Sequence, residues 1–227
     1  AFVINPTLYR KVNYEPLRDF TGVSLGISFP YLLVVHPSLP AKNVRELIAL
    51  AKARPGQITF ASSGSGQANH LAGEMFKDAA GIDILHIPYK GGGPVLTDMM
   101  GGQVLMTFGT VLQTLPQVRA GRLRGLAVSS AKRVAFAPEL PTIAEAALPG
   151  FEAIGWYSFA VPAGTPAPVV SRLNGLIAGV MKTPKVNDLM RTIGGQPFHL
   201  SPEEFSKLNQ QELERFGKLI KQANIKL

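Results

Sequence analysis

Short apolar strands alternate with helices between residues 32 and 129, and this alternation leaves few possible folds for the chain. Helices separate the predicted strands: one begins at the capping-box sequence from Asn43 to Glu46, and another ends at Gly81. Strands joined by helices at such short intervals favour βαβ units and a mostly parallel sheet. The sequence therefore predicts one α/β domain over residues 32–129. Its predicted strands are Leu32 to Val35, Ile58 to Ala61, Ile84 to Ile87, Val104 to Phe108 and Arg124 to Ser129.

The segments on either side of this block contain fewer strands, and Thr142 to Glu145 has the sequence of a second capping box. Residues 20–31 have an extended pattern that we expect to break at Pro30, and the only later strand is predicted over Trp156 to Val161. Helices follow it, the first with Thr165 as its cap and Pro166 in its first turn. These helices carry apolar stripes with few strands to cover them. We expect either a helical layer on a small sheet, or further strands that precede residue 1.

Composition excludes several classes of protein. The chain has 227 residues, of which 46% are hydrophobic and 17% charged, as is typical of a folded protein. The absence of cysteine excludes disulfides and thiolate metal sites, and leaves both cytoplasm and periplasm open. No apolar run approaches the roughly eighteen residues that a membrane-spanning helix needs. Residues 1–6 lack the pattern of a secretory signal, which we expect to be either absent or already removed, so the compartment is not readable from the sequence.

The net charge of +8 points to anionic partners, but the excess is evenly spread. Residues 32–129 hold nine Lys and Arg against five Asp and Glu, and the remaining residues carry an equal excess. The tightest basic cluster, Arg119, Arg122 and Arg124, has no interleaved aromatic residues. We therefore expect no nucleic-acid partner, and a mild positive field that favours small anions.

The stretch from Gln57 to Phe76 has the pattern of a strand, a small polar loop and a helix. Such a loop leaves the first amides of the helix without internal partners, next to the positive end of the helix dipole. Serine hydroxyls and glycine backbone would let it hold a carboxylate or phosphate without a formal positive charge. Alternatively, the serines only cap the helix. The candidate contacts are Ser62, Ser63, Gly64, Ser65, Gly66 and Gln67.

Other candidate contacts lie in neighbouring elements. Lys90 and Gly91 open a second glycine-rich turn between a predicted strand and a helix, and such turns of a parallel sheet open on the same edge. Thr110 follows the next strand, and Tyr157 lies in the strand after residue 155. His70 is expected to donate to a ligand or to the loop backbone, or to be purely structural. A solvated lysine, a tight turn and a core aromatic residue are the alternatives for these positions.

Known catalytic and cofactor motifs do not fit. The glycines around Ser65 lack the third glycine of a dinucleotide fingerprint, since Asn69 occupies that position, and they do not form a serine-hydrolase elbow. There is no phosphate-binding P-loop motif. The histidines, His36, His70, His86 and His199, are scattered without carboxylates at metal-ligand spacing. We therefore expect no catalytic residue, no metal and no cofactor.

Motifs along essentially the whole chain are similar to those of one receptor family. At these residues the sequence resembles the substrate-binding receptors of the tripartite tricarboxylate transporter family, the Bug-type periplasmic receptors. The motifs are Ile4-Asn5-Pro6 with Leu8-Tyr9, Phe60 to Gly66 with His70 to Glu74, His86 to Gly91, Leu96 to Asp98 with Gly101 to Val104, Gly121 to Val128, Pro141 to Glu145, Leu148 to Glu152 and Pro162 to Pro166.

This resemblance implies a two-lobed α/β fold of the periplasmic-binding-protein (Venus flytrap) type, each lobe a mainly parallel sheet flanked by helices. Residues 32–129 would form the second lobe, and residues 1–31 with 130–227 the first, with crossings near Pro30 and Ser129. The resemblance implies no catalysis. It implies a small organic acid or amino acid as ligand, membrane transporter subunits as partners and a periplasmic location, and we expect a monomer.

Some positions depart from the family pattern. The family normally begins with further βα units and a glycine-rich loop of the first lobe, so we expect the N-terminal part of that lobe to be missing here. Gln67 stands where a small hydroxyl residue is common, and Leu105 and Gly109 stand where polar or acidic residues are frequent. Two other functions remain open: an α/β enzyme that uses the loop as a phosphate or nucleotide cradle, and a ligand sensor that signals to a membrane partner.

Overall fold

A long strand, β1 (Phe20–Val35), runs straight through the position where a break was expected. Its first part pairs antiparallel with β7 (Gln196–Pro197) at Ile27 and Ser28, and its last part, from Tyr31, pairs with other strands. Pro30 lies between these two paired regions, so its missing N–H removes neither set of ladder bonds. The prediction of a break at Pro30 is therefore wrong, although the extended pattern before it is confirmed.

The computed structural model describes residues 3–8, 11–192 and 194–222. The chain divides into two compact units: unit 1 comprises Ala1–Phe29 and Trp156–Leu227, and unit 2 comprises Pro30–Gly155. The crossings between lobes were expected near Pro30 and Ser129, and the unit boundaries fall at Phe29–Pro30 and Gly155–Trp156.

Residues 130–155 belong to unit 2 because several contacts tie them to its sheet. The Ser129 hydroxyl donates to the carbonyl of Ala153, and the Val128 N–H donates to the carbonyl of Pro141 at 2.9 Å. The ring of Phe151 packs edge-on against Phe76 of unit 2, with centroids 6.2 Å apart. The assignment of the units to receptor lobes stays a prediction.

Unit 2 is built on a mixed sheet with the strand order β3-β2-β4-β1-β5. β2 (Thr59–Ser62) pairs in parallel with both β3 (Leu85–Pro88) and β4 (Met106–Thr110). β1 is antiparallel to β4 and to β5 (Arg124–Val128), so it is the one strand of this unit that runs against the others. The expected α/β class is confirmed, and the antiparallel β1 makes the sheet mixed.

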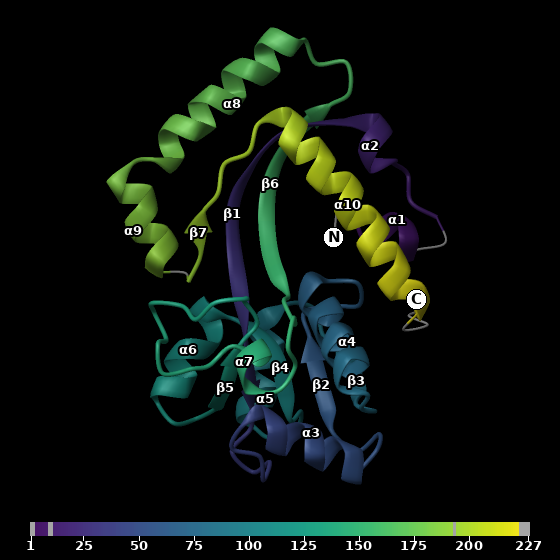
Figure 1. Cartoon of the computed structure of the whole chain (residues 1–227), viewed down its shortest axis with the longest axis vertical. Helices are drawn as coiled ribbons and strands as arrows, with labels where there is room; N and C mark the ends of the chain where they lie inside the picture. The colour runs from purple at the N-terminus through teal and green to yellow at the C-terminus, as the bar shows by residue number, and fades with distance from the viewer. Residues whose placement is uncertain (1–2, 9–10, 193, 223–227) are drawn as a thin grey trace. The chain divides into compact units, whose positions relative to one another are not determined.

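The helices of unit 2 lie close to the predicted positions (Figure 1). α4 ends as expected at Gly81, which caps it in the left-handed conformation (φ +58°). The two predicted N-terminal caps also form: Asn43 accepts from the N–H of Glu46, and Thr142 and Glu145 make a complete capping box. The helices are α3 (Val44–Ala53), α4 (Ala68–Ala80), α5 (Gly92–Met100), α6 (Val111–Arg119) and α7 (Ile143–Ala146).

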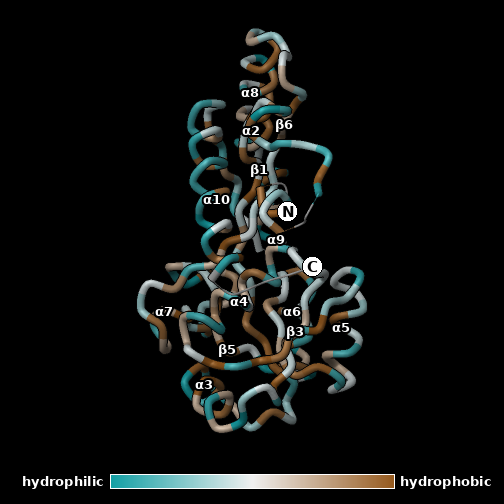
Figure 2. Tube along the Cα trace, turned by 90° about the vertical axis from the view of Figure 1, so that its right-hand side faces the viewer, coloured by the Kyte–Doolittle hydropathy of each residue, from teal (hydrophilic) through white to brown (hydrophobic). Residues whose placement is uncertain are grey.

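Unit 1 consists mainly of helices around the first part of β1. β6 (Ile154–Pro162) and the short β7, which the sequence did not predict, both pair with β1. α10 (Pro202–Gln222) contacts the single-turn helices α1 (Asn5–Leu8) and α2 (Pro16–Asp19), and α8 (Ala167–Met181) contacts both α10 and α9 (Pro184–Thr192). In Figure 2, α10 is mostly hydrophilic in colour. It turns Phe205, Phe216 and Ile220 inward, at the spacing of one helical face.

α8 differs from the prediction at its start, and its apolar stripe is largely uncovered. α8 begins one residue later than predicted: Pro166 occupies the cap position, and the Thr165 hydroxyl donates back to the carbonyl of Pro162 at 2.7 Å. The apolar stripe of α8 is poorly covered, because Leu176 and Val180 are 58% and 52% exposed.

None of the helices in the described part of the chain has the length and apolarity needed to cross a membrane.

Gly73 of α4 allows the helix to approach β2. A Cβ at this position would come 2.3 Å from the ring of Phe60, which is fully buried. We expect Gly73→Ala to lower the free energy of unfolding by about 1–3 kcal/mol, since one of the two groups must move. Urea denaturation followed by circular dichroism measures this.

Gly175 of α8 provides the matched control, because a Cβ there meets no atom within 4 Å. Gly175→Ala should stabilise the chain by roughly 0.5–1 kcal/mol through helix propensity alone. Equal effects of the two substitutions would contradict the close packing of α4 on β2.

Candidate functional site

Three strand ends meet at one edge of the unit 2 sheet. Because β2, β3 and β4 are parallel neighbours, the loops after Ser62, Pro88 and Thr110 leave the sheet on the same side. Backbone bonds join the first two loops: the N–H of Tyr89 donates to the carbonyl of Ser62, and the N–H of Gly91 donates to that of Ser63, both at 3.0 Å. The expected grouping of these loops is therefore present within unit 2.

The third loop reaches the second through Gln113. The Thr110 hydroxyl donates to the Gln113 side-chain oxygen at 3.1 Å. That amide lies against Gly92, where a Cβ would come 2.5 Å from the same oxygen. Any larger residue at Gly92 would therefore displace the Gln113 amide from this position. The structure brings Thr110 and Gly91 into one connected edge.

The loop after β2 is shaped by two glycines in conformations that other residues rarely adopt. Gly64 has φ +148° and Gly66 has φ +74°. The N–H of Gly64 donates to the Ser62 hydroxyl at 3.2 Å, and the N–H of Gln67 donates back to the carbonyl of Gly64 at 3.1 Å. Ser63 is used internally as well, since its hydroxyl donates to the Asn69 side chain at 2.9 Å.

Some N–H groups at this edge have no partner among the described contacts. Neither the N–H nor the hydroxyl of Ser65 is bonded, and Gln67 provides no side-chain cap for α4. Gly91 likewise does not cap α5, and Thr110 does not cap α6, because its hydroxyl is directed to Gln113. Elsewhere in unit 2, the side chains of Asn43 and Thr142 cap α3 and α7. The three helices that begin at the shared edge thus leave their first amides open.

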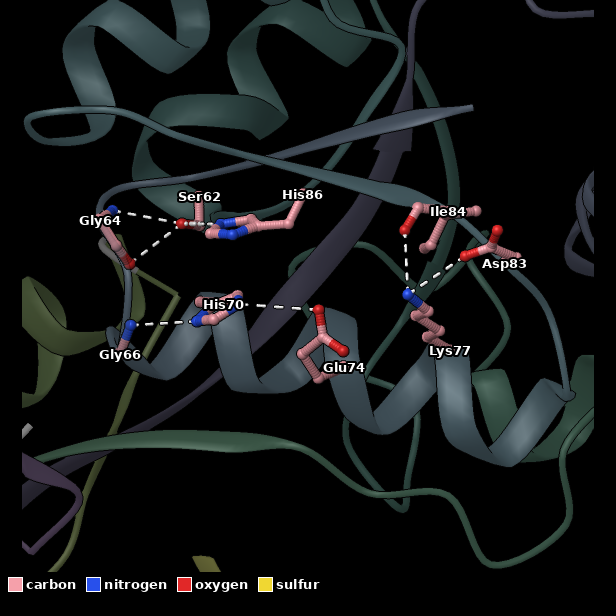
Figure 3. A network of polar contacts seen from close by, with 9 residues as sticks. All are labelled: Ser62, Gly64, Gly66, His70, Glu74, Lys77, Asp83, Ile84 and His86. Atoms are coloured by element: carbon pink, nitrogen blue, oxygen red, sulfur yellow. Dashed lines mark hydrogen bonds and ion pairs between the residues drawn. The ribbon is translucent and has the colours of Figure 1, made fainter. Parts of the chain in front are cut away.

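A buried histidine, His70, and a partly buried one, His86, lie next to the loop, as Figure 3 shows. His70 is 3% exposed, and its Nδ1 accepts the N–H of Gly66 at 3.0 Å. Its other nitrogen, Nε2, therefore carries the proton and lies 3.6 Å from the buried carboxylate of Glu74. The ring of His86 stacks on that of His70, with centroids 3.8 Å apart, and its Nε2 lies 2.7 Å from the Ser62 hydroxyl.

These contacts change the roles expected for two residues. Ser62 is fully buried and His70 nearly so, and the Ser62 hydroxyl and Nδ1 of His70 bond to the loop itself. We therefore assign them to support of the loop. Residues that sequence reasoning missed are His86, Asn69 and Gln113. Only His86 had a signal, since it opens one of the family motifs.

The remaining predicted residues are more exposed. Gln67 and Lys90 are exposed, and Gly91 is partly buried with φ +105°. Tyr157 is 66% exposed and belongs to unit 1, where its ring lies 5.2 Å from that of Phe29. None of the described contacts of residues 62–67 involves a Lys or Arg side chain. In the described part of the chain, no three His, Cys, Asp or Glu side chains are grouped so that they could hold a metal ion.

Burial and neighbouring charge set the protonation state at the loop. Partial burial lowers the pKa of His86 to about 4, with a further decrease from His70 and a partial offset from Glu74. His86 is therefore neutral at pH 7. On the adjoining turn, burial and the hydrogen bond to Asp98 raise the pKa of Tyr89 to about 12, so its hydroxyl stays a donor.

Comparison with known proteins agrees with this arrangement. The sequence pattern described as tripartite tricarboxylate transporter family receptor matches residues 1–225. The chain belongs to this family. It is a family of solute receptors and not a class of enzymes.

Two curated relatives of this chain are longer than it is. A UPF0065 protein from Pseudomonas sp. is 37% identical over 97% of this chain and 66% of its own length. Protein BugT of Bordetella pertussis is 32% identical over 97% of this chain and 68% of its own length. The chain thus spans about two thirds of the length of these relatives.

Solved structures share the fold of the receptor chain. A protein of R. palustris solved with adipate has a TM-score of 0.90 and 36% identity, covering 98% of this chain and 75% of the other. The periplasmic binding protein BugD has a TM-score of 0.89 and 32% identity, with 99% and 76% coverage. MatC from Rhodopseudomonas palustris with bound malate has a TM-score of 0.84 and 25% identity, with 96% and 75% coverage. The expected periplasmic-binding-protein fold is confirmed.

Acidification should destabilise the receptor chain through His86. Between its folded pKa of about 4 and the ordinary value of 6.5, the unfolded chain binds more protons than the folded one. The stabilisation from neutral His86 is therefore complete above pH 6.5 and is lost as the pH falls to about 4. Urea denaturation at about pH 7 and about pH 4.5 should show the decrease in free energy of unfolding.

His86→Gln isolates this contribution from that of the acidic residues. Glutamine does not titrate, so the decrease between the two pH values should be smaller in this variant than in the wild type. An identical decrease in both proteins would show that His86 is not the group responsible.

Proposed function

We propose that this chain forms the ligand-holding part of an extracytoplasmic solute receptor that binds a small carboxylated metabolite and delivers it to membrane transporter subunits. The observation that carries the proposal is the set of open amides at the starts of α4, α5 and α6, on one edge of the sheet. Adipate and malate in the solved relatives support an organic acid as the ligand class, with an amino acid as a further possibility.

The physical basis is replacement of water around a carboxylate by fixed dipoles. The hydroxyl and N–H of Ser65 and the first amides of α4 donate to the anion, next to the positive end of the helix. Gly64 and Gly66 shape the loop, and Ser62 and His70 support it from below. The rim of this proposed site comprises Ser63, Gln67, Lys90, Gly91 and Thr110, and Tyr157 of unit 1 stays a candidate contact.

The wider assignment follows the family. We propose that unit 2 corresponds to the second lobe of the receptor and unit 1 to part of the first. A periplasmic location and a monomeric state belong to the same proposal. The proposed role is transport. A role in signalling would use the same ligand-binding part with a different membrane partner.

A ligand panel tests the proposal against a phosphate-binding enzyme, since the same amides would also accept phosphate. A saturating ligand stabilises the folded chain by about 2.7 kcal/mol at a hundredfold excess over its Kd. We expect adipate, malate or an amino acid to raise the melting temperature, and nucleotides and sugar phosphates to leave it unchanged. A shift with nucleotides alone would favour the enzyme.

Ser65→Asp tests the loop itself. A second carboxylate about 4 Å from the bound one costs roughly 4 kcal/mol at an effective dielectric constant near 20, or about a thousandfold in Kd. Isothermal titration with the acid that scores in the panel should therefore show no binding, while the urea midpoint stays near that of the wild type. Ser171→Asp, on the exposed surface of α8, makes the same charge change and should bind normally. Retained affinity in Ser65→Asp would rule out the loop as the anion site.

A further inference from the structure

His86 contacts the candidate loop from below although it is not one of the predicted ligand contacts. It lies on β3, one strand away from the loop, and is partly buried. We propose that His86 is a positioning residue: its ring N–H fixes the Ser62 hydroxyl, and that hydroxyl fixes the Gly64 amide and so presents Ser65 to the anion. The link to anion binding rests on the proposed function. The link to loop geometry stands on contacts within unit 2.

The contacts of the Ser62 hydroxyl determine which nitrogen of His86 carries the proton. Its oxygen accepts the N–H of Gly64 at 3.2 Å and lies 3.0 Å from the carbonyl oxygen of Gly64 and 2.7 Å from Nε2 of His86. A hydroxyl has one proton. If it were given to His86, two oxygen atoms with lone pairs would face each other at Gly64. All three contacts are satisfied when Ser62 donates to that carbonyl and Nε2–H of His86 donates to Ser62.

The ring of His86 also supports the second fixed point of the loop. It stacks on His70 at 3.8 Å with an interplanar angle of 17°, and lies 4.8 Å from the ring of Phe60. His70 in turn accepts the N–H of Gly66. The two amides that these histidines fix, those of Gly64 and Gly66, flank Ser65, whose own N–H and hydroxyl are open. His86 therefore helps to fix the amides on both sides of Ser65, that of Gly64 through Ser62 and that of Gly66 through His70.

The wild-type protein offers a first test without any substitution. Nitrogen-15 NMR of the full chain at about pH 7 distinguishes the two neutral tautomers of a histidine ring. We expect His86 to be protonated at Nε2 and to keep that proton in slow exchange. A proton on Nδ1 would overturn the proposal, because Ser62 could not then satisfy both of its other contacts.

Two substitutions separate the hydrogen bond from the ring stack. His86→Phe keeps a ring against His70 and Phe60 but has no N–H, whereas His86→Gln places an amide N–H close to the position of Nε2. Hydrogen exchange of the Gly64 amide should be about tenfold faster in His86→Phe and within about threefold of the wild type in His86→Gln. Ser62→Ala, which leaves the ring untouched, should match His86→Phe.

An amide at the other end of the same strand pair is the reference. The N–H of Leu85 donates to the carbonyl of Ile58 at 2.8 Å, away from the loop. Its exchange should be the same in all the proteins, because the substitution acts on the loop and not on the sheet. Equal acceleration at Leu85 and Gly64, or no acceleration at Gly64, would show a general structural role and overturn the proposal.

Binding measurements on the same proteins connect the loop to the ligand. Adipate and malate serve as probes, and we expect His86→Phe to weaken binding about tenfold and His86→Gln to restore it. Unchanged affinity in His86→Phe despite faster Gly64 exchange would overturn the role in anion binding. If the wild type binds neither these acids nor any other carboxylate, the proposed function fails, while the tautomer and the exchange rates still decide the role of His86 in the loop.

Discussion

Open peptide N–H groups at the carboxyl edge of β2, β3 and β4 are the constraint on which the rest of unit 2 depends. Helix starts are normally satisfied by a nearby serine, threonine or asparagine, as Asn43 and Thr142 do for α3 and α7. At the shared edge, the hydroxyls that could do the same are directed elsewhere: Ser63 to Asn69, and Thr110 to Gln113. The loops are thereby fixed in place while their helix amides stay available.

Local elements were predictable from the sequence because their signals lie within a few residues. The stop at Gly81 and the caps at Asn43 and Thr142 depend on backbone conformation and nearby side chains, and all three are confirmed. The continuity of β1 and its antiparallel insertion were not predictable. Strand direction is decided by partners far along the chain, and Pro30 lies between the residues of β1 that pair with β7 and those that pair with β4.

The candidate site shows the same division. The loop from Ser62 to Gly66 could be recognised from its composition, since glycine and serine after a strand are typical of an anion site. The inward orientation of Ser62 and the contribution of His86 could not. Histidines sixteen residues apart give no periodic signal, and they meet only because β3 pairs with β2 beneath the start of α4. The sequence therefore indicated the loop, but not the buried contacts of Ser62 and His86 that support it.

None of the described contacts joins residues 62–67 to a Lys or Arg side chain, and this has a consequence for how the anion of our proposed function would leave. An anion paired with a buried cation abandons an uncompensated charge when it dissociates, and the cost of that step slows release. Peptide dipoles hold the anion through several partial charges, and water can satisfy each of them again one at a time. A loop of this kind suits reversible binding, in which the ligand must be released as readily as it is bound.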